Sequence, residues 1–306
     1  MESDSLRCLW VMPQDNGCNR SVKQRANSGS VPDLRHNKKV NTSRPTNPTI
    51  AELKAVSQPQ EIRGRQSSEH WLNEVYLRKL SPYQTRLLLK AGFSANGVTY
   101  LMIATGFAAG LALLIPGLPG GLLAAFFGQL QMLLDCSDGE VARWRQTSSP
   151  AGVFLDKLGH YLAEGFIPIA LGIRAVGGVS ELDSQNLGFV ALGLLLSVLV
   201  LFNKALNDMV HVARAFNGLP KLSESPAVAA PKSSALAKLR AIVRLFPFNR
   251  IFHSIEMTLL IAIAAVADLF VGDLVATQFL LQFMVIAAAI TVVGHIVAIL
   301  NSSRLR

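Results

Sequence analysis

Charged residues are scarce in this chain of 306 residues: only 16% are Asp, Glu, Lys or Arg, whereas half are hydrophobic. Soluble globular domains usually carry about a quarter charged residues, so this composition disfavours an ordinary soluble domain. Cysteine is also rare, with three residues and no CxxC spacing. Neither a disulfide framework nor a zinc site is therefore expected.

The first part of the chain lacks long apolar segments and is poor in aromatic residues. It shows no basic region followed by an apolar one, so no signal peptide is expected. Residues 1–68 are rich in Asn, Ser, Pro, Gln, Lys and Arg, and we predict that they form a disordered basic arm. The net charge of +9 favours anionic lipid head groups as partners rather than nucleic acid.

Long apolar runs fill the remainder, residues 69–306, which we predict to be the membrane domain. About 20 apolar residues span a bilayer core. The predicted fold class is an all-α integral membrane protein, a bundle of six transmembrane helices with interfacial amphipathic helices. The predicted spans are about residues 98–115, 120–138, 152–176, 187–212, 255–271 and 279–300. The interfacial candidates are residues 233–246 and a helix from His70 to a break at Ser81-Pro82.

The positions of Lys and Arg predict the orientation of these spans. The loops after the first, third and fifth spans contain almost no basic residue, whereas the opposite loops and both termini are basic. Because Lys and Arg collect on the cytoplasmic side, both termini are expected to face the cytoplasm of a cytoplasmic or inner membrane.

A charged run interrupts the apolar sequence between the second and third spans. Asp135 and Asp138 are three residues apart, and Gly152, Asp156 and His160 are spaced by four, so each set shares a helix face. Ionisable residues within membrane segments are costly and usually mark a functional site. Clustered carboxylates repel one another unless a cation lies among them, and oxygen ligands favour a hard divalent ion such as Mg²⁺.

Two further residues of the run suit a phosphate-containing ligand. Gly139 lets a ligand approach the backbone closely, and the guanidinium of Arg143 can pair with a phosphate. Together with the acidic residues, they predict a metal-held pyrophosphate substrate at the cytoplasmic mouth of the bundle.

The same run resembles the signature of the CDP-alcohol phosphatidyltransferases, D-x2-D-G-x2-A-R-x8-G-x3-D-x3-D. Residues 94–99, SANGVT, are similar to the Pro-Asn-x-x-Thr segment that begins the family's first span, with Ala95 in place of Pro. The resemblance covers about residues 70–300. The first seven fixed positions are kept with every spacing, as Asp135, Asp138, Gly139, Ala142, Arg143, Gly152 and Asp156.

The resemblance implies a reaction of phospholipid biosynthesis. An alcohol attacks a CDP-linked donor, commonly CDP-diacylglycerol, and CMP leaves. It also implies two divalent metals, Mg²⁺ or Mn²⁺, and a possible homodimer. By the same resemblance, Asp135, Asp138 and Asp156 would be metal ligands. Gly139, Ala142, Arg143 and Gly152 would shape the CDP pocket.

The eighth position departs from the signature, because His160 replaces the fourth aspartate, the family's metal ligand and general base. In one interpretation, His160 is the base, and its neutral imidazole can also ligate a metal. In a second, it marks a different acceptor or donor with one metal firmly bound. In a third, the protein is an inactive scaffold or regulator. Glu164, one turn further, suggests a Glu164–His160 relay in which the carboxylate raises the basicity of the imidazole.

The acceptor is not specified by the motif, and a soluble sugar phosphate is one alternative. Lys204, with Arg214 or Arg250, is a candidate for binding a phosphorylated acceptor, although Lys204 is also placed to pair with Asp208, four residues on. His253 and Glu256, at the start of the fifth span, are further candidates to line the same cavity.

Overall fold

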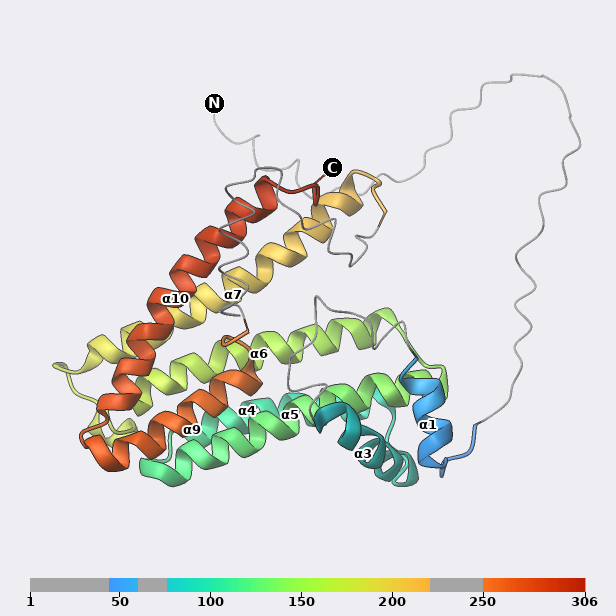
Figure 1. The fold of residues 1–306 in the computed structure, drawn as a ribbon, viewed down its shortest axis with the longest axis horizontal. Coiled ribbons are helices and arrows are strands. Elements are labelled where there is room, and N and C mark those ends of the chain that lie inside the picture. Colours follow the sequence, from blue (N-terminus) through green and yellow to red (C-terminus); the bar gives the residue numbers. More distant parts are fainter. Residues whose placement is uncertain (1–43, 60–75, 221–249, 306) are drawn as a thin grey trace, which may run out of the picture. The chain divides into compact units, whose positions relative to one another are not determined.

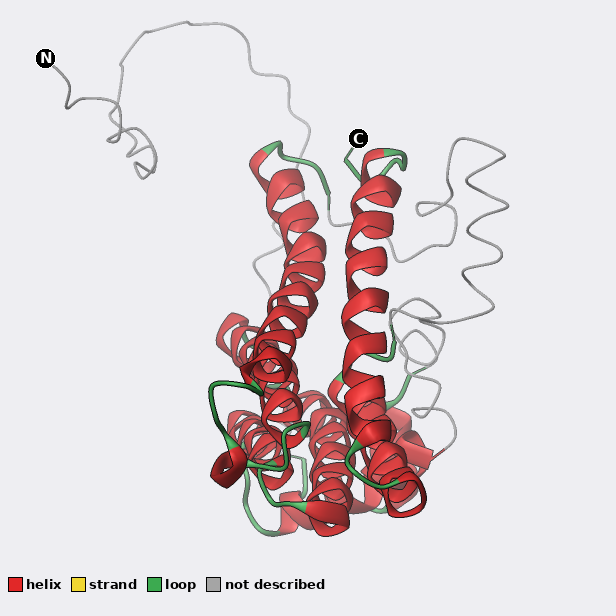
Figure 2. Ribbon diagram, turned by 90° about the vertical axis from the view of Figure 1, so that its left-hand side faces the viewer, coloured by secondary structure: helices red, strands yellow, loops and turns green. Residues whose placement is uncertain are grey.

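The computed structural model describes residues 44–59, 76–220 and 250–305, which lie in one compact unit that begins at Ser43. Helices and their connections make up all of these described residues, without a strand among them (Figures 1 and 2). The all-α prediction is therefore confirmed for this part of the chain. The helices are α1 (Ile50–Ser57), α3 (Arg78–Lys90), α4 (Ala95–Leu113), α5 (Gly117–Arg145), α6 (Pro150–Arg174), the 3₁₀ turn η2 (Val179–Glu181), α7 (Leu187–Phe216), α9 (Ser254–Val271) and α10 (Val275–Leu300).

Five of the described helices are long and apolar enough to cross a membrane: α4, α5, α7, α9 and α10. They overlap five of the six predicted spans and indicate a multi-pass integral membrane protein. The third predicted span, 152–176, does form a helix of 25 residues, α6. Asp156, Lys157, Glu164 and Arg174 are distributed along α6, so it fails the composition expected of a span, and the count of six stays a prediction.

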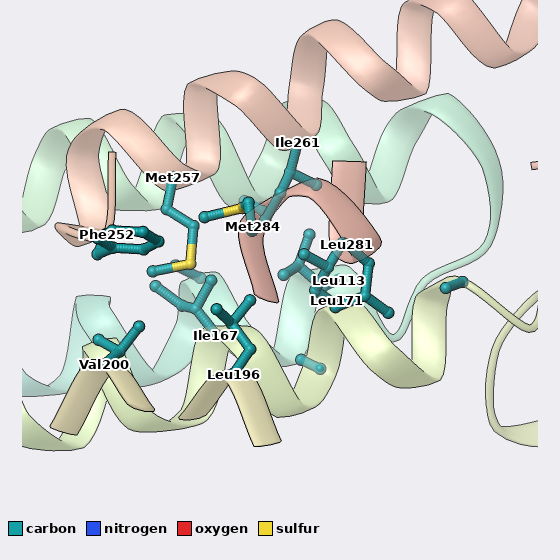
Figure 3. Close-up of a cluster of buried hydrophobic side chains, with 14 of the residues drawn as sticks. Leu113, Ile167, Leu171, Leu196, Val200, Phe252, Met257, Ile261, Leu281 and Met284 are labelled. Carbon is teal, nitrogen blue, oxygen red and sulfur yellow. The ribbon is translucent and has the colours of Figure 1, made fainter. Parts of the chain in front are cut away.

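The main hydrophobic core lies among α4, α5, α6, α7, α9 and α10 (Figure 3). Ile167 of α6 and Leu196 of α7 are fully buried there, as are Met257 of α9 and Leu281 of α10. Outward-facing side chains are also apolar, with Phe270 and Ile290 exposed by 85% and 68%. Large apolar residues on the outer face are costly in water, so this surface fits a lipid environment.

Small residues set the closest helix crossings. A Cβ added at Gly106 of α4 would lie 2.8 Å from Nε2 of Gln131 in α5 and 2.9 Å from Cβ of Ala163 in α6. Gly193 of α7 packs against the backbone of α6, since a Cβ added at Gly193 would lie 2.8 Å from Cα of Gly172. Small residues of this kind let membrane helices approach closely. Because α4 packs on both α5 and α6, it aligns the two helices that carry the charged run.

The length of α5 places the charged run at one end of the bundle. The helix has 29 residues, whereas about 20 suffice to cross the hydrocarbon core. The segment from Asp135 to Arg145 occupies its C-terminal end. If α5 enters the membrane near Gly117, this end lies at or beyond the opposite interface.

Two expectations about the N-terminal part need correction. Residues 44–59, predicted to be disordered, are ordered, and a capping box begins α1: Thr49 accepts from the amide of Glu52, whose carboxylate accepts from the amide of Thr49. These hydrogen bonds lower the pKa of Glu52. The compact unit begins at Ser43 rather than at residue 69. The polar composition of residues 1–68 hid this helix, which a short capping box starts and packing on α5 stabilises.

The predicted helix break at Ser81-Pro82 is also wrong, because α3 continues through Pro82 to Lys90. Proline removes the hydrogen bond to the carbonyl four residues earlier. That carbonyl, on Arg78, instead accepts from Nε2 of Gln58 at 3.0 Å. Several predicted segments lie outside the described residues: residues 1–43 and 60–68 of the arm, residues 70–75 of the helix from His70 and the whole segment 233–246.

Candidate active site

A short link joins the two helices that carry the charged run. Gln146, which follows α5, adopts the left-handed conformation with φ 56° and ends that helix. Ser149 caps α6 by accepting a hydrogen bond from the Gly152 amide at 3.1 Å, and Pro150 occupies the first turn, where its missing N–H is tolerated. The chain therefore turns back within a few residues and brings the aspartates of both helices together.

His160 stands beside two aspartates at this turn. Its Nε2 atom lies 3.0 Å from Oδ1 of Asp135 and 3.5 Å from Oδ1 of Asp156. One ligand atom from each of the three residues lies within 4.8 Å of the others. Two carboxylates and an imidazole nitrogen form a donor set suited to a divalent cation, which would offset the repulsion between the carboxylates. The two carboxylates thus fit the predicted Mg²⁺ or Mn²⁺, because both ions prefer oxygen ligands.

Asp138 stands outside that three-residue group. Its Oδ2 atom accepts a hydrogen bond from Thr99 Oγ1 of α4 at 2.8 Å, and only 9% of the residue is exposed. Asp135 and Asp156 remain close enough to act on it electrostatically. Asp135 and Asp138 share a helix face as predicted, but Asp135 faces α6 whereas Asp138 bonds to α4.

The predicted nucleotide-binding residues lie on the two helices that the short link joins, three of them in α5 and Gly152 in α6. The guanidinium of Arg143 lies over Gly139, because a Cβ added there would be 3.0 Å from Nη1. The Ala142 carbonyl accepts from the amide of Thr147 at 3.0 Å, which tightens the end of α5. A Cβ added at Gly152 would lie 3.3 Å from Oδ1 of Asn96. A larger side chain at either glycine would therefore crowd this surface.

Glu164 does not form the predicted hydrogen bond with His160. Its Oε1 atom lies 3.7 Å from Nδ1 of His160, beyond hydrogen-bond reach. Oε2 instead accepts from Lys204 Nζ at 2.7 Å, and Oε1 lies 3.2 Å from Nδ1 of His253. Glu164 is only 3% exposed. Glu164 is therefore the buried counterion of Lys204 and also contacts the imidazole of His253.

The three predicted acceptor-binding residues have different partners in the structure. Lys204 bonds Glu164, and the alternative pairing with Asp208 is wrong, since Asp208 accepts from Lys157 Nζ at 2.5 Å and from Tyr161 at 2.9 Å. Arg214 is 8% exposed and donates to the carbonyls of Pro220 and Arg304 near the C-terminus. Arg250 precedes α9, and its carbonyl accepts from the amide of His253 at 3.1 Å.

Two residues at this site had no assigned role in the sequence analysis. Thr99 holds Asp138, and Asn96 faces Gly152 across the turn. Both belong to the segment SANGVT, whose similarity to the start of the family's first span was the available signal. His253 was expected to line the cavity, and it does contact Glu164.

A family model now adds an independent finding to this geometry. The model of the CDP-alcohol phosphatidyltransferases matches residues 93–301. The chain belongs to this family. No curated protein matches it.

Membership of the CDP-alcohol phosphatidyltransferase family makes the chain a transferase that uses a CDP-alcohol donor and an alcohol acceptor. The matched range contains all eight motif positions, including the histidine at the last one. It begins after α1 and α3. The contacts that these two helices make with α5 therefore join the matched region to helices that precede it.

Proposed function

We propose that this protein transfers a phosphatidyl or related phospho-alcohol group from CDP-diacylglycerol, or another CDP-alcohol, to an alcohol acceptor in phospholipid biosynthesis. The observation that carries the proposal is the convergence of Asp135, Asp156 and His160 within 4.8 Å, inside a region that matches the family. The site faces the cytoplasm in this proposal, because the basic residues lie at the same end of the spans.

The proposed reaction is a substitution at the phosphorus distal to cytidine. The acceptor oxygen forms a new bond to that phosphorus, the bond to the bridging oxygen breaks, and its electron pair leaves with CMP. The hydroxyl proton passes to His160. A divalent cation held by Asp135, Asp138 and Asp156 would supply neutralisation of the pyrophosphate and of the departing CMP.

His160 is proposed as the base through its Nε2 atom, which faces the two aspartates. The Nδ1 atom is buried without a hydrogen-bond partner and lies 3.7 Å from Glu164. A negative charge at that distance stabilises the imidazolium that forms when Nε2 takes the proton. Nε2 has one lone pair, so in this proposal His160 takes the proton and the three aspartates hold the metal. Nε2 can take that proton only when Asp135 binds the cation instead of an Nε2–H.

Gly139 and Gly152 are proposed to let the nucleotide approach the backbone, while Arg143 pairs with a phosphate and Ala142 keeps the wall small. Lys204 is proposed to lie beside the acceptor but not as a free cation, because Glu164 neutralises it. Arg214 is bound to backbone carbonyls at the far end of α7 and is not part of this proposal. Arg250 has no described contact that links it to the acceptor.

The proposal is tested by extracting lipids after overexpression and comparing them by mass spectrometry. Wild type is expected to produce a phosphodiester lipid that the Asp138→Ala variant does not. Asp183→Ala, in the loop between η2 and α7, is the matched control, because it removes an exposed acid far from the motif in sequence. Donor binding without CMP release over a broad acceptor panel would contradict transfer and favour a scaffold.

A further inference from the structure

The segment 44–58 lies before the family-matched region, yet it contacts the end of α5 that carries Gly139 and Arg143. Arg44 Nη1 donates to the carbonyls of Arg143 and Trp144, each at 3.1 Å. The Arg44 guanidinium also lies 5.3 Å from the centre of the Trp144 ring, whose Nε1 donates to the carbonyl of Pro45 at 3.0 Å. Arg44 thus satisfies carbonyls that a helix C-terminus leaves without partners.

Helix α1 then fixes the side chain of Arg143 itself. Leu53 is fully buried in a cluster with Val141 and Trp144 of α5. Nε of Arg143 donates to the carbonyl of Ser57, the last residue of α1, at 2.7 Å. This bond leaves the two Nη atoms over Gly139, where they can meet a phosphate.

Glu140, next to Gly139, ties the same helices together. Its Oε1 atom accepts from Gln58 Nε2 at 2.8 Å and from Ser81 Oγ at 2.6 Å, and Oε2 accepts from Thr85 Oγ1 at 2.7 Å. The residue is 2% exposed. A buried carboxylate is costly unless hydrogen bonds satisfy it, so these donors from α3 and the end of α1 hold α5 in one position.

We infer that the segment 44–58 is a positioning element for the donor nucleotide: it holds Arg143 over Gly139 and thereby increases affinity for the cytidine diphosphate group. The physical reason is preorganisation, because an arginine already held in place loses less conformational freedom when a phosphate binds. The inference rests on the proposed function, which supplies the role of Gly139 and Arg143 in binding CDP.

The test compares Leu53→Glu with Ala51→Glu in the full-length protein. Leu53 is buried against α5, whereas Ala51 is exposed on the same helix. Leu53→Glu should release α1 and weaken equilibrium binding of CDP in the presence of Mg²⁺ about tenfold, as expected for a lost charge-assisted interaction. It should change kcat less than about twofold, because the Asp135–Asp156–His160 group is untouched. Ala51→Glu should leave both quantities unchanged.

Arg44→Ala provides a second variant that opens no buried core. It should raise the Kd for CDP in the same direction, with faster hydrogen exchange at residues 139–146 as the sign of a loosened α5 end. Exchange that rises while CDP affinity and the KM for the donor stay at wild-type values overturns the inference. So does a loss confined to kcat. Should Leu53→Glu fail to fold, Arg44→Ala decides alone.

A separate result bears on the proposed function. Wild-type protein that does not bind CDP at all contradicts that function and the inference with it. Wild-type protein that binds CDP, with both variants binding equally tightly, contradicts only the inference.

Discussion

At the scale of single residues, the replacement of an aspartate by His160 changes the charge of the metal group. Asp135, Asp138 and Asp156 leave three negative charges where the family signature has four. A hard divalent cation is held by its charge and its oxygen ligands, so one carboxylate fewer is expected to weaken most the second of the two metals that the family resemblance implies. The histidine also places a nitrogen base 3.0 Å from Asp135.

His160→Asp should retain transfer and bind the second metal more tightly. The acid limb of its kcat/KM profile should move to lower pH, because a carboxylate loses its charge at lower pH than an imidazole gains one. Metal titrations and pH–rate profiles on the purified variant check this. His160→Ala is the comparison: wild-type turnover in both His160→Ala and Glu164→Gln across pH 6–8 would show that neither residue takes part in proton transfer.

The pair of Glu164 and Lys204 has a stability consequence of its own. Lys204→Met leaves a 3% exposed carboxylate that has lost its lysine partner and keeps the imidazoles of His253 and His160 nearby, and it should destabilise the fold by about 3 kcal/mol. Adding Glu164→Gln should restore part of this loss, because the buried charge is gone. Thermal unfolding in detergent measures both variants.

Lys157→Met is the matched control for this pair, since it breaks the pair with Asp208 in which Lys157 is 53% exposed. A loss below about 1 kcal/mol is expected for such an exposed pair. Equal losses in Lys204→Met and Lys157→Met would contradict the counterion role of Glu164.

At the scale of elements, the site depends on helix ends and helix crossings rather than on any loop of special shape. Ser149 and Pro150 start α6 immediately after the left-handed Gln146 ends α5. The crossing of α4 with both helices then fixes their separation through Gly106. A change at a crossing is therefore expected to disturb the site without touching a ligand.

The crossing of α6 and α7 allows a test of how closely these helices pack. In Gly193→Ala, the new Cβ would lie 2.7 Å from the carbonyl oxygen of Pro168 and 2.8 Å from Cα of Gly172. These are backbone atoms, so the helices must separate, and the melting temperature should fall. Gly188→Ala, in the first turn of the same helix, meets nothing within 4 Å and should be neutral or slightly stabilising, since alanine favours helix. Equal melting temperatures for both variants would contradict close packing here.

At the scale of the whole molecule, the five candidate spans explain the low charge of the chain. The candidate window of α7 is only 22% buried and that of α10 only 28%. Much of the apolar surface of α7 and α10 therefore has no protein partner in the described chain, as is expected of helices that face lipid.

Orientation is open to a direct labelling test. In a variant without the three native cysteines, Ser184→Cys lies before α7 and Asn217→Cys follows it, both at exposed positions. A membrane-impermeant maleimide should label position 184 in intact cells and position 217 only after permeabilisation. The reverse pattern would place the proposed site outside the cytoplasm.

The sequence by itself determined the features of this protein that depend on neighbouring residues in the chain. Helix periodicity placed Asp156 and His160 on one face, apolar length predicted the helices, and the spacing of the motif identified the family that the match to residues 93–301 confirmed. Each of these features depends on residues within a few turns of one another, where helix geometry alone fixes which side chains are neighbours.

Only the tertiary structure decided which residues meet across helices. Thr99 meets Asp138 from 39 residues away, Lys204 takes the carboxylate of Glu164 from 40 residues away, and Ser57 reaches Arg143 across 86 residues. Such contacts depend on crossing angles set by small residues and buried side chains throughout the bundle. Because of these contacts, Glu164 is a counterion of Lys204 and not the expected relay to His160. Part of the arm that was expected to be disordered packs on α5 instead.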